Sequence, residues 1–225
     1  TWWIWGAAFV ILVEIVMGAA APYVIVPLFY DLKPLDDEEL VQRVRSLARK
    51  TDTRIAEVNT IDLSRRTTAA NAMVMGLGST KRIALGDTLY EEYSAEEIES
   101  ILAHELGHQV HHDLGLGILV QGAFTLLSFY AAHLTLEWSV RRFGFDSIAD
   151  LAAVPLVALV GFFFLLITLP LVNAYSRWRE RQADRYALRI TEAPAAFRRA
   201  MERLANQNLA EMDPPSWVVL LLYDH

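Results

Sequence analysis

The chain has 225 residues, of which 54% are hydrophobic. With a mean hydropathy of +0.26 it is too apolar for an ordinary soluble domain and indicates a membrane protein. The formal net charge of −7 gives no support for nucleic-acid binding, and the absence of cysteine excludes disulfides and thiolate zinc sites.

The chain opens on a long apolar stretch, residues 2–29, which predicts a transmembrane helix within residues 1–30. Trp2, Trp3 and Trp5 are typical of an interfacial belt at one end of such a helix. The stretch lacks a basic leader and a small-residue cleavage site, so it does not resemble a signal peptide. Because the chain begins without methionine and stops abruptly at His225, we expect an internal piece of a longer protein.

Residues 31–113 predict a helix, a small sheet and a second helix. Apolar residues at helical spacing between positions 40 and 48 predict an amphipathic helix with an aspartate cap. Three further segments are typical of strands: residues 55–63, 72–77 and 82–85. The last two are predicted to form a hairpin. An edge strand of such a sheet can pair with an extended peptide, or the sheet can serve only for packing.

The most informative motif is His104-Glu105-Leu106-Gly107-His108. Ser94 and Glu97 form a capping-box pattern that begins a helix ahead of it. Residues four apart share one face of a helix, so both imidazoles can reach one metal ion, with Glu105 beside them. A zinc ion held in this way lowers the pKa of its water, and an adjacent carboxylate can take the proton as that water attacks a carbonyl. The alternative is a helix surface that carries two histidines by chance.

His111 and His112 lie further along the same helix, each roughly 4.5–6 Å beyond His108 at a rise of 1.5 Å per residue. Neither can join both motif histidines on one ion unless the helix bends. We therefore interpret them as cap or interfacial residues.

Two more membrane spans are predicted within residues 114–173, at positions 114–136 and 151–173, with a short loop between them. Residues 31–113 and 174–225 then face the same side of the membrane. Those two segments hold 18 of the 20 lysines and arginines, whereas the loop holds only Arg141 and Arg142. The distribution predicts that the large segments, and with them the catalytic part, are cytoplasmic.

A catalytic zinc ion needs three protein ligands, and the best candidate for the third is Glu180. Asp184 lies four residues on, on the same helical face, where it can accept a hydrogen bond from a liganding imidazole. The alternative is a solvated, arginine-rich helix end with a few ion pairs. We interpret the arginines between 177 and 189 as a helix surface that faces lipid headgroups. Some of these arginines can instead steer a substrate carboxylate.

HELGH and SRWRERQAD, with membrane spans between them, resemble the integral-membrane zinc metalloproteases that include the type I CAAX prenyl protease and the HtpX heat-shock protease. Further stretches favour the prenyl protease branch: Pro27-Leu28-Phe29, Lys33-Pro34-Leu35, residues 71–76 and 82–89, Phe143-Gly144-Phe145, and residues 222–225. The resemblance covers nearly all of the chain from about Pro27 onward.

The resemblance implies roles for individual residues. His104, His108 and Glu180 match the zinc ligands of the family, and Glu105 matches its general base. Asp184 matches the acid that follows the third ligand. Asn71 matches an asparagine beside a substrate-binding strand that would include Ala72 and Met73. His225 matches a histidine that stabilises the oxyanion.

Together these observations predict a mainly α membrane protein with three transmembrane helices. A small zincin-like α+β catalytic part has a short sheet beside the HExxH helix, and residues 174–225 complete the site. The expected function is a membrane-embedded zinc metalloendopeptidase that resembles the type I CAAX prenyl protease, with one zinc ion per chain. Its expected partners are the lipid bilayer and a peptide or protein substrate, either prenylated or unprenylated. The alternatives are an HtpX-like quality-control protease of membrane proteins and a catalytically silent zinc-binding scaffold.

Overall fold

The structure is a computed structural model that describes residues 1–76, 80–209 and 214–223. The chain divides into two compact units. We call one of them the helical unit, made of Thr1–Met17, Gly115–Arg177 and Ser216–His225. The other is the sheet unit, made of Gly18–Leu114 and Trp178–Pro215.

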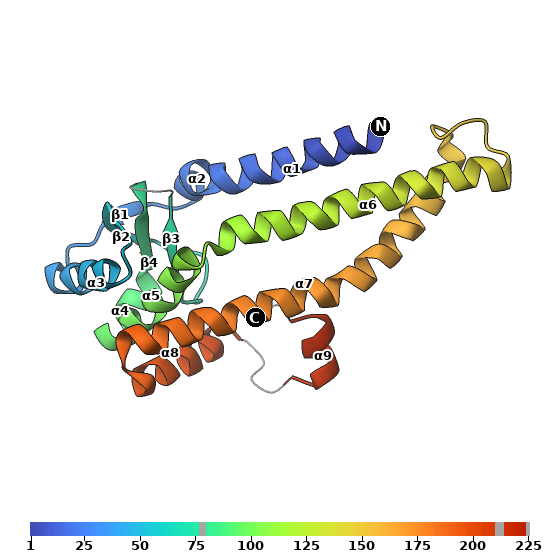
Figure 1. Cartoon of the computed structure of the whole chain (residues 1–225). Helices are drawn as coiled ribbons and strands as arrows, with labels where there is room; N and C mark the ends of the chain where they lie inside the picture. Colours follow the sequence, from blue (N-terminus) through green and yellow to red (C-terminus); the bar gives the residue numbers. More distant parts are fainter. Residues whose placement is uncertain (77–79, 210–213, 224–225) are drawn as a thin grey trace. The chain divides into compact units, whose positions relative to one another are not determined.

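The helical unit is built from long apolar helices (Figure 1): α1 (Trp2–Ala20), α6 (Asp113–Phe143) and α7 (Val154–Thr191), which follows a short 3-10 turn, η3 (Leu151–Ala153). Among the described residues, three helical segments are long and apolar enough to cross a membrane: Trp2–Ala20, Asp113–Phe143 and Leu151–Thr191. The predicted mainly helical fold with three membrane spans is therefore confirmed.

All three helices differ in extent from the predicted spans, and α6 continues to Phe143, past the predicted end at position 136. α1 ends at Ala20 and is followed by a π-helical turn, η1 (Ala21–Ile25), and a short helix, α2 (Val26–Phe29). Pro22 lacks the backbone N–H that a regular α-helical ladder needs, which accounts for the irregular turn. In contrast, α7 continues without interruption to Thr191, so the third span and the segment that carries Glu180 are one helix.

Close contacts join α1 to α6 within the helical unit. A Cβ atom at Gly6 would come within 2.5 Å of the Phe129 ring, and one at Gly122 would lie 3.6 Å from Ile11. At the C-terminal end of the unit, the side chain of Asn173 donates to the carbonyl of Leu221 (2.8 Å) in the short helix α9 (Ser216–Leu221). Gly6 and Gly122 therefore allow side chains of one helix to pack closely against the backbone of the other.

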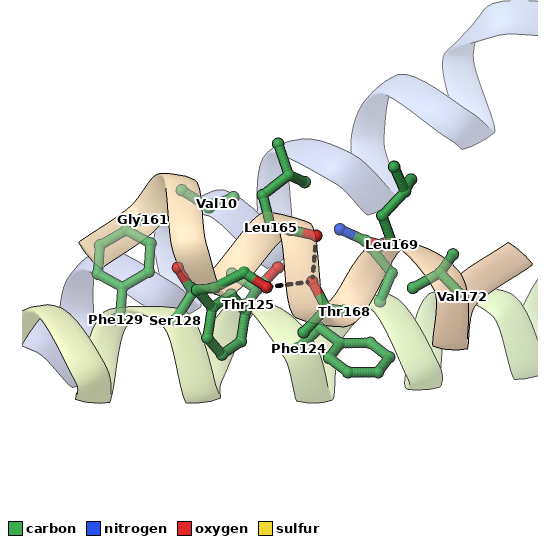
Figure 2. A pocket seen from close by; sticks show the side chains of 12 residues that line it. Val10, Phe124, Thr125, Ser128, Phe129, Gly161, Leu165, Thr168, Leu169 and Val172 are labelled. Atoms are coloured by element: carbon green, nitrogen blue, oxygen red, sulfur yellow. Dashed lines mark hydrogen bonds between the residues drawn. The ribbon is translucent and has the colours of Figure 1, made fainter. Parts of the chain in front are cut away.

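A cavity of about 510 Å³ lies between α1, α6 and α7 (Figure 2). Its lining is mostly apolar, with a few hydroxyl groups such as those of Thr125, Ser128 and Thr168. The Thr168 hydroxyl donates to the carbonyl of Phe164 (2.9 Å) in its own helix. Such a bond satisfies a hydroxyl group within the hydrocarbon core of a membrane. None of the predicted site residues that the structure describes lines this cavity.

The sheet unit contains a four-stranded mixed sheet in the order β1-β2-β4-β3 (Figure 1). β1 pairs antiparallel with β2, β2 pairs parallel with β4, and β4 pairs antiparallel with β3. The strands are β1 (Leu32–Pro34), β2 (Glu57–Ile61), β3 (Ala72–Met75) and β4 (Arg82–Gly86). The three predicted strands and the antiparallel pairing of the last two are confirmed, whereas β1 was not predicted because three residues carry no periodic signal.

Helices cover one face of this sheet: α3 (Glu38–Lys50), α4 (Asp87–Glu92), α5 (Ala95–Val110) and α8 (Pro194–Gln207). Their main hydrophobic core includes Val44, Ile83, Leu85 and Leu102, all fully buried. The alternate residues of the strands, such as Ala84, face a second, smaller cluster with Ile61 and Met75. Both faces of the sheet are therefore packed, and its free positions are the two edge strands, β1 and β3.

Side-chain caps begin two of the helices. Asp37 accepts a hydrogen bond from the backbone N–H of Leu40 (3.0 Å) at the start of α3. At the start of α5, Ser94 accepts from the backbone of Glu97, and the Glu97 carboxylate accepts from the backbone N–H of Ser94 (2.9 Å). The predicted capping box is confirmed, and it sets where the helix of the HExxH motif begins.

Candidate active site

The HExxH motif lies in the second half of α5, with one side of the helix buried. Ile98, Leu102 and Leu106 are 0–2% exposed and pack into the core of the sheet unit. His104 and His108 lie on the adjoining face, with 14% and 23% of their side chains exposed. The apolar ridge therefore anchors the helix and leaves both imidazoles at an accessible surface.

Gly107 allows α5 and α7 to approach closely. A Cβ atom at this position would lie 3.1 Å from the Cα atom of Ala183, a contact shorter than side chains normally make. Ala183 is itself fully buried. Two small residues thus face each other where the helices cross, and the close approach brings Glu180 and Asp184 of α7 to the histidines of α5.

Three side chains converge on one point. The Nε2 atoms of His104 and His108 are 3.2 Å apart. The Glu180 carboxylate reaches both of them, with Oε2 3.2 Å from His104 Nε2 and Oε1 3.6 Å from His108 Nε2. One donor atom from each residue lies within 4.8 Å of the other two, so the set can hold a single metal ion.

The opposite ring nitrogen of each histidine contacts a carboxylate. His104 Nδ1 lies 2.9 Å from Asp184 Oδ1, and His108 Nδ1 lies 2.7 Å from Asp113 Oδ2. A neutral imidazole that donates its Nδ1–H to a carboxylate carries its lone pair on Nε2. In that tautomer, both lone pairs point into the space that the two imidazoles share with Glu180. Asp113 was missed in the sequence because it lies just beyond the end of α5, immediately before a predicted membrane span, where no motif marks it.

The side chains that converge here form a donor set suited to a divalent cation. Burial lowers the pKa of His104, but the hydrogen bonds to Asp184 and Glu180 outweigh it and raise the pKa to about 10. Burial lowers the pKa of His108, and the charge on His104 adds to the decrease although Glu180 opposes it. A cation at the centre would meet two imidazole nitrogens and a carboxylate, a donor set typical of catalytic zinc.

Glu105 belongs to the same electrostatic environment but is not one of the three converging residues. Burial raises the pKa of its carboxyl group, while the charges on His104 and His108 act in the opposite direction. A carboxylate with a raised pKa beside a candidate metal site is suited to accept a proton and to give it back.

The expected substrate residues lie on the edge strand β3 and just before it. β3 packs beside α5 (Figure 1), and its outer edge has no partner strand among the described residues. Ala72 is buried, Met73 is partly buried, and the side chain of Asn71 is exposed. His225 lies outside the described residues.

Side chains from α4 and the end of α8 hold the segment that leads into β3. The Asn208 side chain accepts from the backbone N–H of Ala70 (3.1 Å) and donates to its carbonyl (3.2 Å). Gln207 donates to the carbonyl of Thr68 (2.9 Å), and the Thr88 hydroxyl donates to that of Ala69 (2.9 Å). These contacts place the backbone ahead of β3, and no sequence pattern indicated them.

His111 and His112 do not join the metal cluster among the described residues. His111 is the C-cap residue of α5, as expected, and its ring packs edge-on against Tyr186 with 5.5 Å between the centroids. His112 adopts a left-handed conformation with φ 55°. Such a residue commonly ends a helix, so the two histidines mark the boundary between α5 and α6.

Comparisons with known proteins agree with this site. The model described as Peptidase family M48 matches residues 34–221. The chain is 31% identical over 228 residues to the "Uncharacterized metalloprotease YhfN" of Bacillus subtilis (strain 168), covering 100% of this chain and 54% of that protein. It is also 31% identical over 240 residues to the "CAAX prenyl protease 1 homolog" of Oryza sativa subsp. japonica, covering 99% and 52%. The "Protease HtpX homolog" of Archaeoglobus fulgidus is 31% identical over 193 residues, covering 84% and 53%.

Among solved structures, the crystal structure of S. mikatae Ste24p superimposes with a TM-score of 0.83 at 26% identity, covering 100% of this chain and 56% of that one. The chain therefore spans about half the length of the relatives that it matches. The matched range contains the HExxH helix, Glu180 and Asp184. The resemblance stated from the sequence is confirmed, and the chain belongs to peptidase family M48.

Proposed function

We propose that this chain carries the catalytic centre of a membrane-embedded zinc metalloendopeptidase related to the type I CAAX prenyl protease. The observation that supports this most is the convergence of two imidazole Nε2 atoms and the Glu180 carboxylate, with each Nδ1 held by its own acid. A site with three such ligands leaves a fourth position open, as hydrolysis requires.

The mechanism assigns separate tasks to the side chains. His104, His108 and Glu180 would hold the zinc ion, and Asp184 and Asp113 orient the two imidazoles. When bound, the ion supplies Lewis-acid activation of the attacking water and of the scissile carbonyl. Glu105 accepts the proton of the attacking water and returns it to the leaving amine. We assign His225 to stabilisation of the oxyanion, on the family resemblance alone.

The substrate is proposed to bind as an extended strand on the outer edge of β3. Main-chain hydrogen bonds to Ala72 and Met73 would align the peptide, and Asn71 would anchor one of its amides or carbonyls. The support for this proposal is that β3 is an edge strand and packs beside α5.

For the substrate class we favour short prenylated peptides over unfolded membrane proteins. The CAAX prenyl protease relative matches 99% of this chain, against 84% for the HtpX relative, at the same identity. The experiment is a cleavage assay of the full-length protein with one peptide in prenylated and unprenylated form, and with an unfolded membrane protein. Preferential cleavage of the prenylated peptide is expected, and activity confined to the unfolded protein would favour the HtpX-like alternative.

The first prediction concerns the base. Glu105→Gln should retain zinc, because Glu105 is not among the converging ligands, but should lose about 10²–10⁴-fold in turnover. Zinc content by elemental analysis and turnover would be measured on the same full-length preparation, with His104→Ala as the variant that should lose the metal. Near wild-type turnover in Glu105→Gln would contradict the mechanism. Absence of cleavage in the zinc-loaded wild type would favour the silent scaffold.

A further inference from the structure

Arg179 is a buried arginine that the mechanism above does not use. It precedes Glu180 in α7, and the residue is only 7% exposed. Its Nη2 atom donates to the carbonyl of His111 (2.8 Å) and makes an ion pair with Asp113 Oδ1. A charge buried to this degree is retained only where it is paired and hydrogen-bonded, and Asp113 and the His111 carbonyl supply these two interactions.

Asp113 connects Arg179 to the candidate zinc ligand His108. Its side chain is 13% exposed, and its two oxygens have different partners. Oδ2 lies 2.7 Å from His108 Nδ1, and Oδ1 faces the Arg179 guanidinium. The three side chains thus form a continuous chain from α7, through the first residue of α6, to the metal-binding face of α5.

The other histidine is held by an acid in a different environment. Asp184, the partner of His104, has 42% of its side chain exposed, about three times as much as Asp113. Water can solvate the exposed carboxylate, whereas a buried one needs a counter-charge to remain ionised and in place. Arg179 supplies that counter-charge for Asp113, on the His108 side of the cluster.

Arg179 also acts on the backbone that carries His108. The last carbonyls of an α-helix have no partner within the helix, and Arg179 binds the one at the C-cap, His111. The left-handed conformation of His112 follows, with φ 55°, and Asp113 then begins α6. One guanidinium group therefore holds both the end of α5 and the acid that orients His108.

We propose that Asp113 and Arg179 form a positioning pair for His108. Asp113 keeps the Nδ1–H of His108 engaged so that Nε2 faces the metal, and Arg179 keeps the Asp113 carboxylate aimed at His108. The inference rests on the proposed zinc site and assigns a role to two residues that lie outside the ligand set.

The test measures zinc affinity rather than activity. The full-length protein in detergent is titrated with zinc in competition with a chelator, and the midpoint of thermal unfolding is recorded in parallel with saturating zinc. Arg179→Met and Asp113→Asn should each lower zinc affinity about 10–100-fold, the range known for partners of metal ligands. Arg181→Met is the matched control, because Arg181 is an exposed arginine two residues further along α7, and its affinity should equal that of the wild type.

The double variant tests whether the two residues act as one unit. Because each single change already disables the pair, the combined loss should stay close to the larger single loss, whereas independent effects would multiply. If Arg179→Met does not fold, Arg179→Lys replaces it in the zinc titration. An ammonium group can pair with Asp113 but cannot reproduce the fork to the His111 carbonyl, so an intermediate loss of several-fold is expected.

Unchanged zinc affinity in Arg179→Met, or in Arg179→Lys if only that variant folds, would overturn the proposal. A lowered unfolding midpoint with unchanged affinity would also overturn it, because the pair would then only join helices. Losses that multiply in the double variant would overturn the idea of a single unit. If the wild type binds no zinc, or if His108→Ala binds it as well as the wild type, the proposed function itself fails.

Discussion

At the scale of single residues, the candidate site brings together electron-pair donors from two helices that are distant in sequence. His104 and His108 come from α5 and Glu180 from α7, and each pair of their donor atoms lies 3.2–3.6 Å apart. Three electron-rich atoms at this separation repel one another unless a proton or a metal ion lies between them. The outer acids, Asp184 and Asp113, direct the lone pairs toward that shared point.

The second prediction separates a ligand from its support. Glu180→Ala should lower zinc occupancy strongly, because two imidazoles alone form a weak site. Asp184→Asn should keep the ligand set and lower affinity about 10–100-fold. Elemental analysis gives occupancy and chelator competition gives affinity. Full occupancy together with full turnover in Glu180→Ala would remove Glu180 from the ligand set.

At the scale of helices and strands, the site depends on two close approaches. α5 and α7 meet where Gly107 faces Ala183, and this contact sets the distance between the HExxH histidines and Glu180. The other approach is that of the loop ahead of β3 to the end of α8, where Asn208 makes two hydrogen bonds to the backbone of Ala70. Backbone atoms take part in both contacts, and backbone can shift less than a side chain to accommodate a change.

The third prediction tests the helix contact. In an exposed helix, Gly→Ala stabilises by about 1 kcal/mol, but here the new methyl group would lie 3.1 Å from the Cα of Ala183. Gly107→Ala should therefore destabilise the fold by about 1–3 kcal/mol, as overpacking does, and lower zinc affinity. The matched control is Gly117→Ala in α6, where nothing lies within 4 Å of the added atom. A Gly107→Ala variant that is as stable as the control and binds zinc normally would show that the helices need not approach so closely.

The fourth prediction tests the contacts that hold the segment before β3. Asn208→Ala removes both hydrogen bonds to Ala70, so the segment that begins the proposed substrate strand loses its restraint. KM for a peptide substrate should rise several-fold while zinc content stays unchanged, and Asn71→Ala should also reduce turnover without loss of metal. Asn206→Ala, an exposed residue of the same helix, is the control. Unaltered kinetics in both Asn208→Ala and Asn71→Ala would argue against binding along β3.

At the scale of the whole molecule, charge indicates how the chain is oriented in the membrane. Residues 31–113 and 174–225 contain 18 of the 20 lysines and arginines. The other two, Arg141 and Arg142, lie in the last turn of α6, beside the loop that leads to α7. We propose that the two basic segments, with the candidate active site, face the cytoplasm.

The fifth prediction tests that orientation with single cysteines, which the chain permits because it has none of its own. Asp146→Cys lies in the loop between α6 and α7, and Arg198→Cys lies on α8. Both positions are exposed. In sealed vesicles with the cytoplasmic face inward, an impermeant maleimide should label Asp146→Cys directly and Arg198→Cys only after permeabilisation. The reverse pattern would place the catalytic centre on the other side of the membrane.

Several features of this protein could be predicted from sequence because they arise from local patterns. The three spans follow from the length of apolar runs, the helix of His104 and His108 follows from its capping box and its spacing, and the strands follow from short β-prone segments between turns. The family resemblance also depends on contiguous motifs. Each of these signals lies within a few tens of residues, where periodicity and chain connectivity restrict the possible structures.

Tertiary structure alone decided which side chains support those motifs. The arginines between 177 and 189 were predicted to face lipid headgroups, which is wrong for Arg179, because it is buried against Asp113 and the end of α5. The pairing of Asp113 with His108 and the hold of Asn208 on Ala70 were likewise absent from the sequence patterns. Arg179 lies 66 positions from Asp113, and Asn208 lies 138 from Ala70, so each contact exists only after the helices have packed. Periodicity determines which face of a helix is apolar, but long-range packing determines which partner each polar residue on the other face will meet.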